Sequence, residues 1–248
     1  MWRWGNAKKR RSMEERRLDL VLVPLGLLVM AVYHGWLLFT FIHNPKRTVI
    51  GLNAHARQRW VRSMMADPLK NGVLAVQTIR NNIMASTLLA TTAITLSSLI
   101  SVVVSSASSE SSSYLVYGNK TPLVSSIKYF SILVCFLVAF LCNVQSIRYY
   151  AHVSFLVSVA PPKNTPGAVS YVGRCLNRGS FFWTLGLRAF YVSFSLFLWI
   201  FGPIPMFSCC CVMSCLLYFL DSTADFTLHF SDHLGGMEDL KMNDVESQ

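Results

Sequence analysis

The chain has 248 residues and a formal net charge of +10, and it is 53% apolar but only 14% charged. Soluble domains carry about 25% charged residues, so this composition argues against an ordinary soluble globular protein. A positive net charge suits an anionic membrane surface or nucleic acid. The chain contains no nucleic-acid-binding motif, and its apolar segments favour the membrane.

Four segments contain no Asp, Glu, Lys or Arg and are long enough to cross a bilayer as helices: 20–45, 81–109, 129–147 and 189–220. A hydrocarbon core of about 30 Å needs roughly 20 apolar residues. These segments also lack the alternation of barrel strands. They predict an all-α, polytopic integral membrane protein, in which a helical bundle of four transmembrane helices is accompanied by an interfacial amphipathic helix. The predicted spans are about 20–42, 82–104, 129–147 and 189–213.

Three parts follow from this pattern: a basic N-terminal segment (1–19), a four-helix transmembrane domain (20–220) and an acidic C-terminal tail (221–248). The basic segment resembles the start of a signal sequence. The apolar run that follows is too long for one and has no cleavage motif, so we expect a retained first helix. His34 lies within this span. It is either a proton relay or ligand, or a neutral imidazole that bonds a neighbouring helix, and we favour the second interpretation.

Residues 53–67 predict the interfacial helix, with Asn53 as its N-cap and Asp67-Pro68 as its end. At about 100° per residue, one side gathers the apolar residues Ala56, Trp60, Val61, Met64 and Met65. The other side gathers His55, Gln58, Arg59 and Arg62. A basic amphipathic helix with a Trp is typical of the headgroup boundary. Arg57 falls on the apolar side, where it needs either a partner, such as a lipid phosphate or an acidic side chain, or a route to the edge by snorkelling.

The second span carries small and hydroxyl residues spaced four apart: Ala93, Ser97, Ser101 and Ser105 in one row, and Thr87, Thr91 and Thr95 in another. Such rows favour close packing of a neighbouring helix over a water-filled path. The serine-rich connection that follows contains Asn119-Lys120-Thr121, a candidate glycosylation site at Asn119.

The last apolar run, 189–220, has 32 residues and would be about 48 Å long as a straight helix. Gly202-Pro203-Ile204-Pro205 predicts a bend within it. We favour a single kinked span over two short half-spans.

Basic residues are concentrated in the connections after the first and third spans, which four crossings place on one side. The positive-inside rule favours a cytosolic location for that side, with both termini external. The opposite orientation would place the seven basic residues of the N-terminal segment in the cytosol but would export the basic connections, so we favour the first. The candidates for contact with lipid or a partner on this basic face are Arg57, Arg59, Trp60, Arg62 and Arg80.

A candidate metal-binding stripe, Asp221, Asp225, His229 and His233, is spaced four apart where the last run ends. We favour the alternative that these four residues belong to a solvated acidic tail and bind no metal. The sequence contains no nucleophile elbow, P-loop, dinucleotide fingerprint or HExxH motif, so we expect no catalytic residues and no cofactor.

Four stretches together resemble plant members of a membrane family known only as domain of unknown function 599: LDLVLVPLGLLVMAVYHGWLL, IGLNAHARQRWV, NGVLAVQTIRNNIMASTLLATTAI and LRAFYVSFSLFLWIFGPIPM. The resemblance implies a four-helix integral membrane protein. It implies no activity, because the family has no established reaction or ligand.

The favoured hypothesis is a non-enzymatic membrane component with a basic cytosolic face that contacts anionic lipid or an acidic partner. The alternative is a small channel or carrier, formed by a homo-oligomer and lined by His34, Arg80, Asn81, Asn82 and the rows of small and hydroxyl residues in the second span. A membrane enzyme or metal-binding protein ranks third. The lipid bilayer is the expected partner and nucleic acid is not. We expect the protein in the endomembrane system or plasma membrane of a eukaryotic cell.

Overall fold

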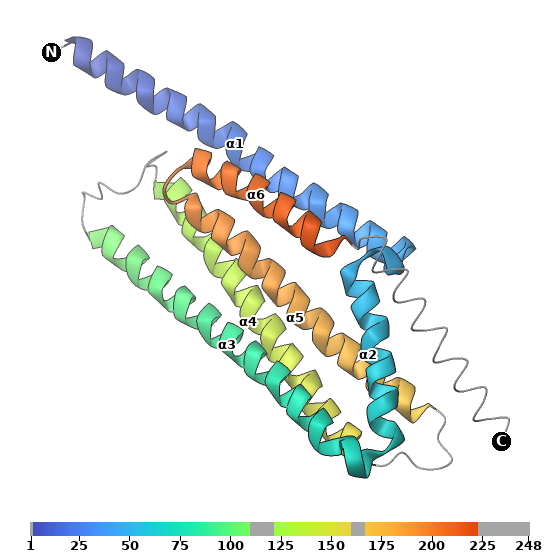
Figure 1. The fold of residues 1–248 in the computed structure, drawn as a ribbon. Helices are drawn as coiled ribbons and strands as arrows, with labels where there is room; N and C mark the ends of the chain where they lie inside the picture. Colours follow the sequence, from blue (N-terminus) through green and yellow to red (C-terminus); the bar gives the residue numbers. More distant parts are fainter. Residues whose placement is uncertain (1, 110–121, 160–166, 223–248) are drawn as a thin grey trace.

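The computed structural model describes residues 2–109, 122–159 and 167–222, all of them helical or in short connections (Figure 1). The α-helices are α1 (Trp2–His43), α2 (Val49–Ala66), α3 (Pro68–Ser109), α4 (Pro122–Ser158), α5 (Ala168–Leu198) and α6 (Pro203–Asp221), and η1 (Pro45–Arg47) is a short 3-10 helix. The predicted all-α class is therefore confirmed. The basic segment before the first span continues α1 as helix.

Five helices of the described chain are long and apolar enough to cross a membrane, whereas the sequence predicted four. They lie roughly side by side, and α2 runs from the end of α1 to the start of α3 (Figure 1). We call the end of the bundle where α2 lies the α2 end. We call the other end, where α5 turns into α6, the hairpin end.

The difference in number arises from the run 189–220, which is not one kinked span. It contains the second part of α5 and all of α6 except its last residue, Asp221, and these helices pack side by side in opposite directions (Figure 1). The chain reverses at 199–202, where the backbone N–H of Gly202 donates to the carbonyl of Leu198 (3.2 Å) and Pro203 begins α6. Gly202 has φ 148° and ψ 169°, a region essentially restricted to glycine. Pro203 has no N–H to lose at the first position of a helix.

Two separate cores hold the helices together. The first contains Val23, Ile132, Phe136, Phe190 and Met206, and it joins α1, α3, α4, α5 and α6. The second lies toward the α2 end, where Val61 and Met65 of α2 pack with residues of α3, α4 and α5 such as Ile79, Val153 and Leu176. The apolar side of α2 is therefore covered by protein.

A polar cluster closes the hairpin end. Lys128 of α4 donates its Nζ to the carbonyl of Trp199 (3.2 Å) and lies 5.1 Å from the centre of the Trp199 ring. The Trp199 indole N–H donates to Asp19 of α1 (3.2 Å). These contacts attach the turn between α5 and α6 to α1 and α4.

The start of α2 differs from the prediction, because Thr48 rather than Asn53 is its N-cap. The Thr48 side chain accepts a hydrogen bond from the Gly51 N–H (3.2 Å), and Thr48 also forms an isolated β-bridge with Ser222 after α6. The predicted end is confirmed, since α2 stops at Ala66 and Asp67 is its C-cap. The α2 start and the α6 end are thus joined directly.

Replacement of Gly202 by Ala should lower the free energy of unfolding by about 1–3 kcal/mol, because a Cβ strains this backbone conformation. Thermal unfolding of the full-length protein in detergent would measure the loss. Gly35→Ala is the control, since a Cβ there meets nothing within 4 Å. Equal melting temperatures for the two variants would contradict the role assigned to Gly202.

If all five apolar helices cross, the two termini lie on opposite sides of the membrane, contrary to the four-span prediction of two external termini. Protease protection of tags on both termini in sealed vesicles should show one tag digested and the other protected. Digestion or protection of both together would contradict five crossings.

Candidate functional site

A largely buried ion pair joins three helices at the end of α6. Arg188 of α5 donates its Nη2 to Asp221 Oδ2 at 2.6 Å, and the two side chains are only 12% and 14% exposed. The Tyr33 hydroxyl of α1 donates to the same Asp221 oxygen. Hydrogen bonds to a charged group are the stronger kind, and burial protects this pair from screening. Asp221 therefore fixes α1, α5 and α6 at one level.

Arg57 of α2 also turns inward, as its position on the apolar side indicates. Its Nε donates to Asn177 Oδ1 of α5 (2.8 Å), and Asn177 Nδ2 donates to the Ala54 carbonyl (3.2 Å). Burial lowers the pKa of Arg57, opposed by a smaller effect of Tyr150, yet a guanidinium keeps its charge at neutral pH. An amide orients Arg57 but cannot neutralise it.

These side chains line a cavity of about 190 Å³ between α2, α5 and α6. Its polar lining includes Asn53 and Arg57 of α2, Ser180, Trp183, Thr184, Arg188 and Tyr191 of α5, and Asp221 of α6. Apart from the adjacent pair Trp183 and Thr184, the α5 residues recur every three or four positions, so they share one face of the helix. We call this space the α2 cavity.

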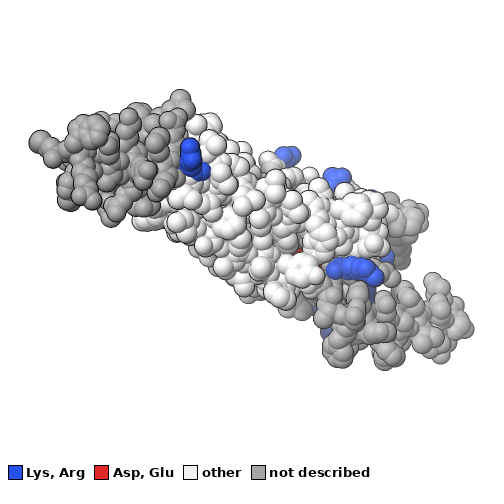
Figure 2. Space-filling model, turned by 90° about the horizontal axis from the view of Figure 1, so that it is seen from above, with Lys and Arg blue, Asp and Glu red and all other residues white. Residues whose placement is uncertain are grey.

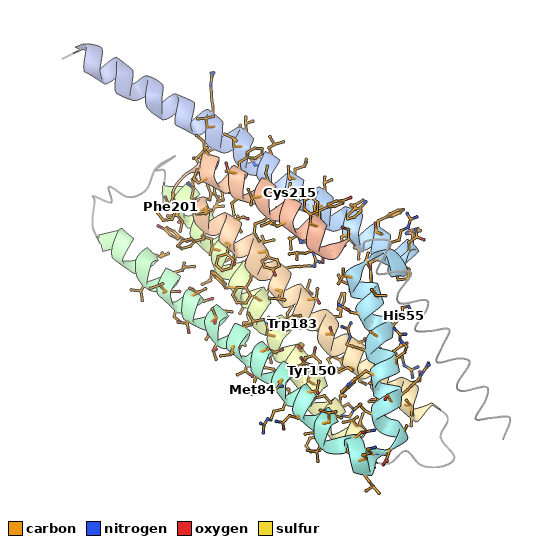
Figure 3. The ribbon with its side chains drawn as sticks, viewed as in Figure 1. His55, Met84, Tyr150, Trp183, Phe201 and Cys215 are labelled. Atoms are coloured by element: carbon orange, nitrogen blue, oxygen red, sulfur yellow. The ribbon has the colours of Figure 1, made fainter. Side chains whose placement is uncertain are left out.

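A second cavity of about 260 Å³ adjoins it, because both are lined by Arg57, Ser180 and Trp183. Its other lining residues are Asn82 and Ala85 of α3 and Tyr150 of α4. In Figure 3, Trp183 and Tyr150 lie near one another, while His55 lies on the outer side of α2. Arg57 thus stands between two spaces beneath α2.

Two buried donors near Arg57 have no partner in the described part of the chain: Trp183 Nε1 and Arg188 Nη1. Since unmade hydrogen bonds of buried donors cost about 1–3 kcal/mol each, they distinguish this site from an ordinary core. The lining therefore contains two buried donors for which no described group supplies an acceptor.

His34 is half-buried on α1, one residue from Tyr33. Its Nδ1 contacts the Met30 carbonyl of its own helix (2.7 Å), and its Nε2 is buried without a partner among the described residues. The ring packs edge-on against Tyr33, with centres 5.1 Å apart. The predicted bond to a neighbouring helix is thus replaced by one within α1.

The other predicted residues are scattered. Arg59 and Trp60 are half-buried, Arg62 and Arg80 are exposed, and of these Trp60 packs against the second core. None of these four lines either cavity. Whether they contact lipid stays a prediction.

Asp221 is held by Arg188 and Tyr33, while the rest of the predicted metal stripe, Asp225, His229 and His233, lies outside the described residues, as does Asn119. No group of three or more metal-binding side chains occurs within the described residues. The metal and glycosylation hypotheses therefore stay predictions.

The threonine row of α3 faces outward and bonds its own helix. Thr87, Thr91 and Thr95 are exposed, and each hydroxyl donates to a carbonyl of its own helix at 2.8–3.1 Å. Ala93 is fully buried in the first core. These threonines are satisfied without water or a neighbouring helix.

Sequence reasoning missed Tyr33, Asn177, Trp183 and Arg188 as members of the site. One signal was available for Arg188: the charge-free run 189–220 begins just after it and ends just before Asp221. Opposite charges at the two ends of an apolar run that folds back on itself can meet. Asn177 and Trp183 carry no comparable signal.

The family model described as "Protein of unknown function, DUF599" matches residues 21–226. The chain belongs to this family. The matched region of this DUF599 chain contains every residue of the α2 cavity, from Val49 to Asp221. A search of the curated proteins and a search of the solved structures each found no significant match.

Asp221→Asn should lower the free energy of unfolding by about 3 kcal/mol or more, because it leaves Arg188 charged and uncompensated in a buried place. The double variant Arg188→Met/Asp221→Leu should lose less than the single variant, since it removes both charges. Thermal unfolding in detergent measures both, and Asp67→Asn, at an exposed position, is the control. A double variant less stable than Asp221→Asn would contradict the role of the pair.

Proposed function

We propose that this membrane protein is a non-enzymatic component whose α2 end contacts anionic lipid headgroups on the cytosolic side. The observation that carries the proposal is the charge at this end of the bundle. Ten Arg and Lys side chains are described there, namely Arg47, Arg57, Arg59, Arg62, Lys70, Arg80, Arg148, Arg174, Arg178 and Arg188. The described acidic residues at this end are Asp67 and Asp221, and Asp221 is already paired.

The lengths of the helices support a position for the bilayer along the bundle. With 19 residues, α6 is about 28 Å long, which matches a hydrocarbon core of about 30 Å. The apolar segments of α3 and α4 have 35 residues each, or about 52 Å, so they extend beyond the core. Figure 1 shows α3, α4 and α5 continuing past the end of α6 at the α2 end. The second core then lies outside the hydrocarbon.

Arg47, Arg80 and Arg148 are exposed and lie close to where the helices would leave the hydrocarbon. We call them the juxtamembrane ring. Figure 2 shows a middle region that is largely free of charge, with most of the visible Lys and Arg toward one end. Each basic residue near an anionic leaflet contributes about 1 kcal/mol, and positive charge favours the cytosolic side.

The test is the lipid preference of the full-length protein in reconstituted membranes, measured with spin-labelled phosphatidylserine and phosphatidylcholine. The wild type should immobilise more phosphatidylserine, and the triple variant Arg47→Gln/Arg80→Gln/Arg148→Gln should lose most of this preference. High salt should weaken the preference as well, because exposed charges are screened.

The matched control is Arg62→Gln/Lys70→Gln/Arg174→Gln, which removes the same charge from exposed positions farther along the α2 end. It should lose less of the preference than the ring variant does, because these charges lie farther from the proposed headgroup level. Equal preferences for the ring variant and the wild type would refute the contact with lipid and favour an acidic protein partner for this face.

A further inference from the structure

We propose that the α2 cavity binds a phosphate group, through Arg57 of α2 and Arg188 and Trp183 of α5. The phosphate belongs either to a lipid headgroup or to a soluble ligand. This site goes beyond the proposed surface contact, because it lies inside the protein and does not include the juxtamembrane ring.

The charge of the cavity is the first argument. Its lining contains Arg57, Arg188 and Asp221 as formal charges. Asp221 is neutralised by Arg188 at 2.6 Å, whereas the contact of Arg57 is an uncharged amide at 2.8 Å. A net charge of +1 remains in a half-enclosed space, where an anion is attracted more strongly than in water.

Hydrogen-bonding capacity is the second argument. Arg57 uses its Nε for Asn177, and no hydrogen bond from the described residues reaches its terminal nitrogens. Arg188 Nη1 and Trp183 Nε1 are buried donors without partners in the described part of the chain. These donors come from two helices, so they suit a tetrahedral group with several acceptor oxygens.

Space and level are the third argument. The cavity of about 190 Å³ is roughly six times the ~30 Å³ that one water occupies in the liquid, so it has room for a phosphate group. It lies where α6 ends at Asp221, the level at which the proposed bilayer placement puts the headgroups. Carbon chains attached to the phosphate would meet Leu217 and Leu220 of α6, which also line the cavity.

The experiment measures thermal stabilisation of the full-length protein in an uncharged detergent and phosphate-free buffer. The probes are inorganic phosphate, phosphatidic acid in mixed micelles, and diacylglycerol with the same tails but no phosphate. A rise in melting temperature with inorganic phosphate identifies a soluble source. A rise with phosphatidic acid but with neither other probe identifies a lipid source.

Two variants test the cavity: Arg57→Gln removes a charged donor, and Trp183→Phe removes one N–H while keeping an aromatic ring. Arg57→Gln should weaken the apparent affinity about tenfold or more, and Trp183→Phe about threefold to tenfold. Trp183→Phe leaves the contact between Arg57 and Asn177 in place, so it remains informative if Arg57→Gln is poorly folded.

The matched control is Arg174→Gln, which removes the same charge from an exposed residue of α5 that lines neither cavity. It should respond as the wild type does. Weakening by either cavity variant beyond this control supports the site. No phosphate-dependent stabilisation of the wild type, or equal responses of both cavity variants and Arg174→Gln, overturns it. Neither result depends on the lipid preference of the juxtamembrane ring.

Discussion

The rest of the α2 end depends on the ion pair between Arg188 and Asp221. A charge buried in a membrane protein needs a partner, and each of these residues has only the other as a charged partner among the described contacts. The pair sets how far α6 extends along α5, and Tyr33 adds α1 to the same point. Because Ser222 then bridges to Thr48, the position of α6 also sets where α2 begins. The α2 cavity follows from this arrangement.

The fold class could be predicted because apolar length is a direct physical requirement of the bilayer. The number of helices could not be predicted in the same way, because a helix that crosses the membrane can contain charged residues and so need not coincide with a charge-free run. The described α5 contains Arg174, Arg178 and Arg188, so only its second part lies in the run 189–220. A long helix can carry such charges where it extends past the hydrocarbon or finds a partner. Gly202-Pro203 was taken as a bend, yet the φ of Gly202 makes it a reversal.

Residue patterns predicted which faces are apolar or polar, but not what covers them. The apolar side of α2 was expected to rest on lipid, and it packs on α3, α4 and α5 through Val61 and Met65. The threonines of α3 were expected to need a neighbour, and their own backbone carbonyls satisfy them. In both cases periodicity gives the face correctly. The covering surface depends on contacts between distant segments, which no local pattern contains.

Two members of the candidate site were singled out from the sequence: Arg57 for its anomalous position, and Asp221 as part of the candidate metal-binding stripe. Arg57 was noticed because a charge on an apolar face demands an explanation, and the structure gives it Asn177, which is 120 positions away. Trp183 is an ordinary aromatic residue by sequence, and it matters because α2 lies over α5. An α2 lying flat in the headgroup layer would leave Arg57 in contact with solvent and lipid. Since α2 instead packs on protein, the charge of Arg57 becomes part of a half-enclosed and donor-rich space.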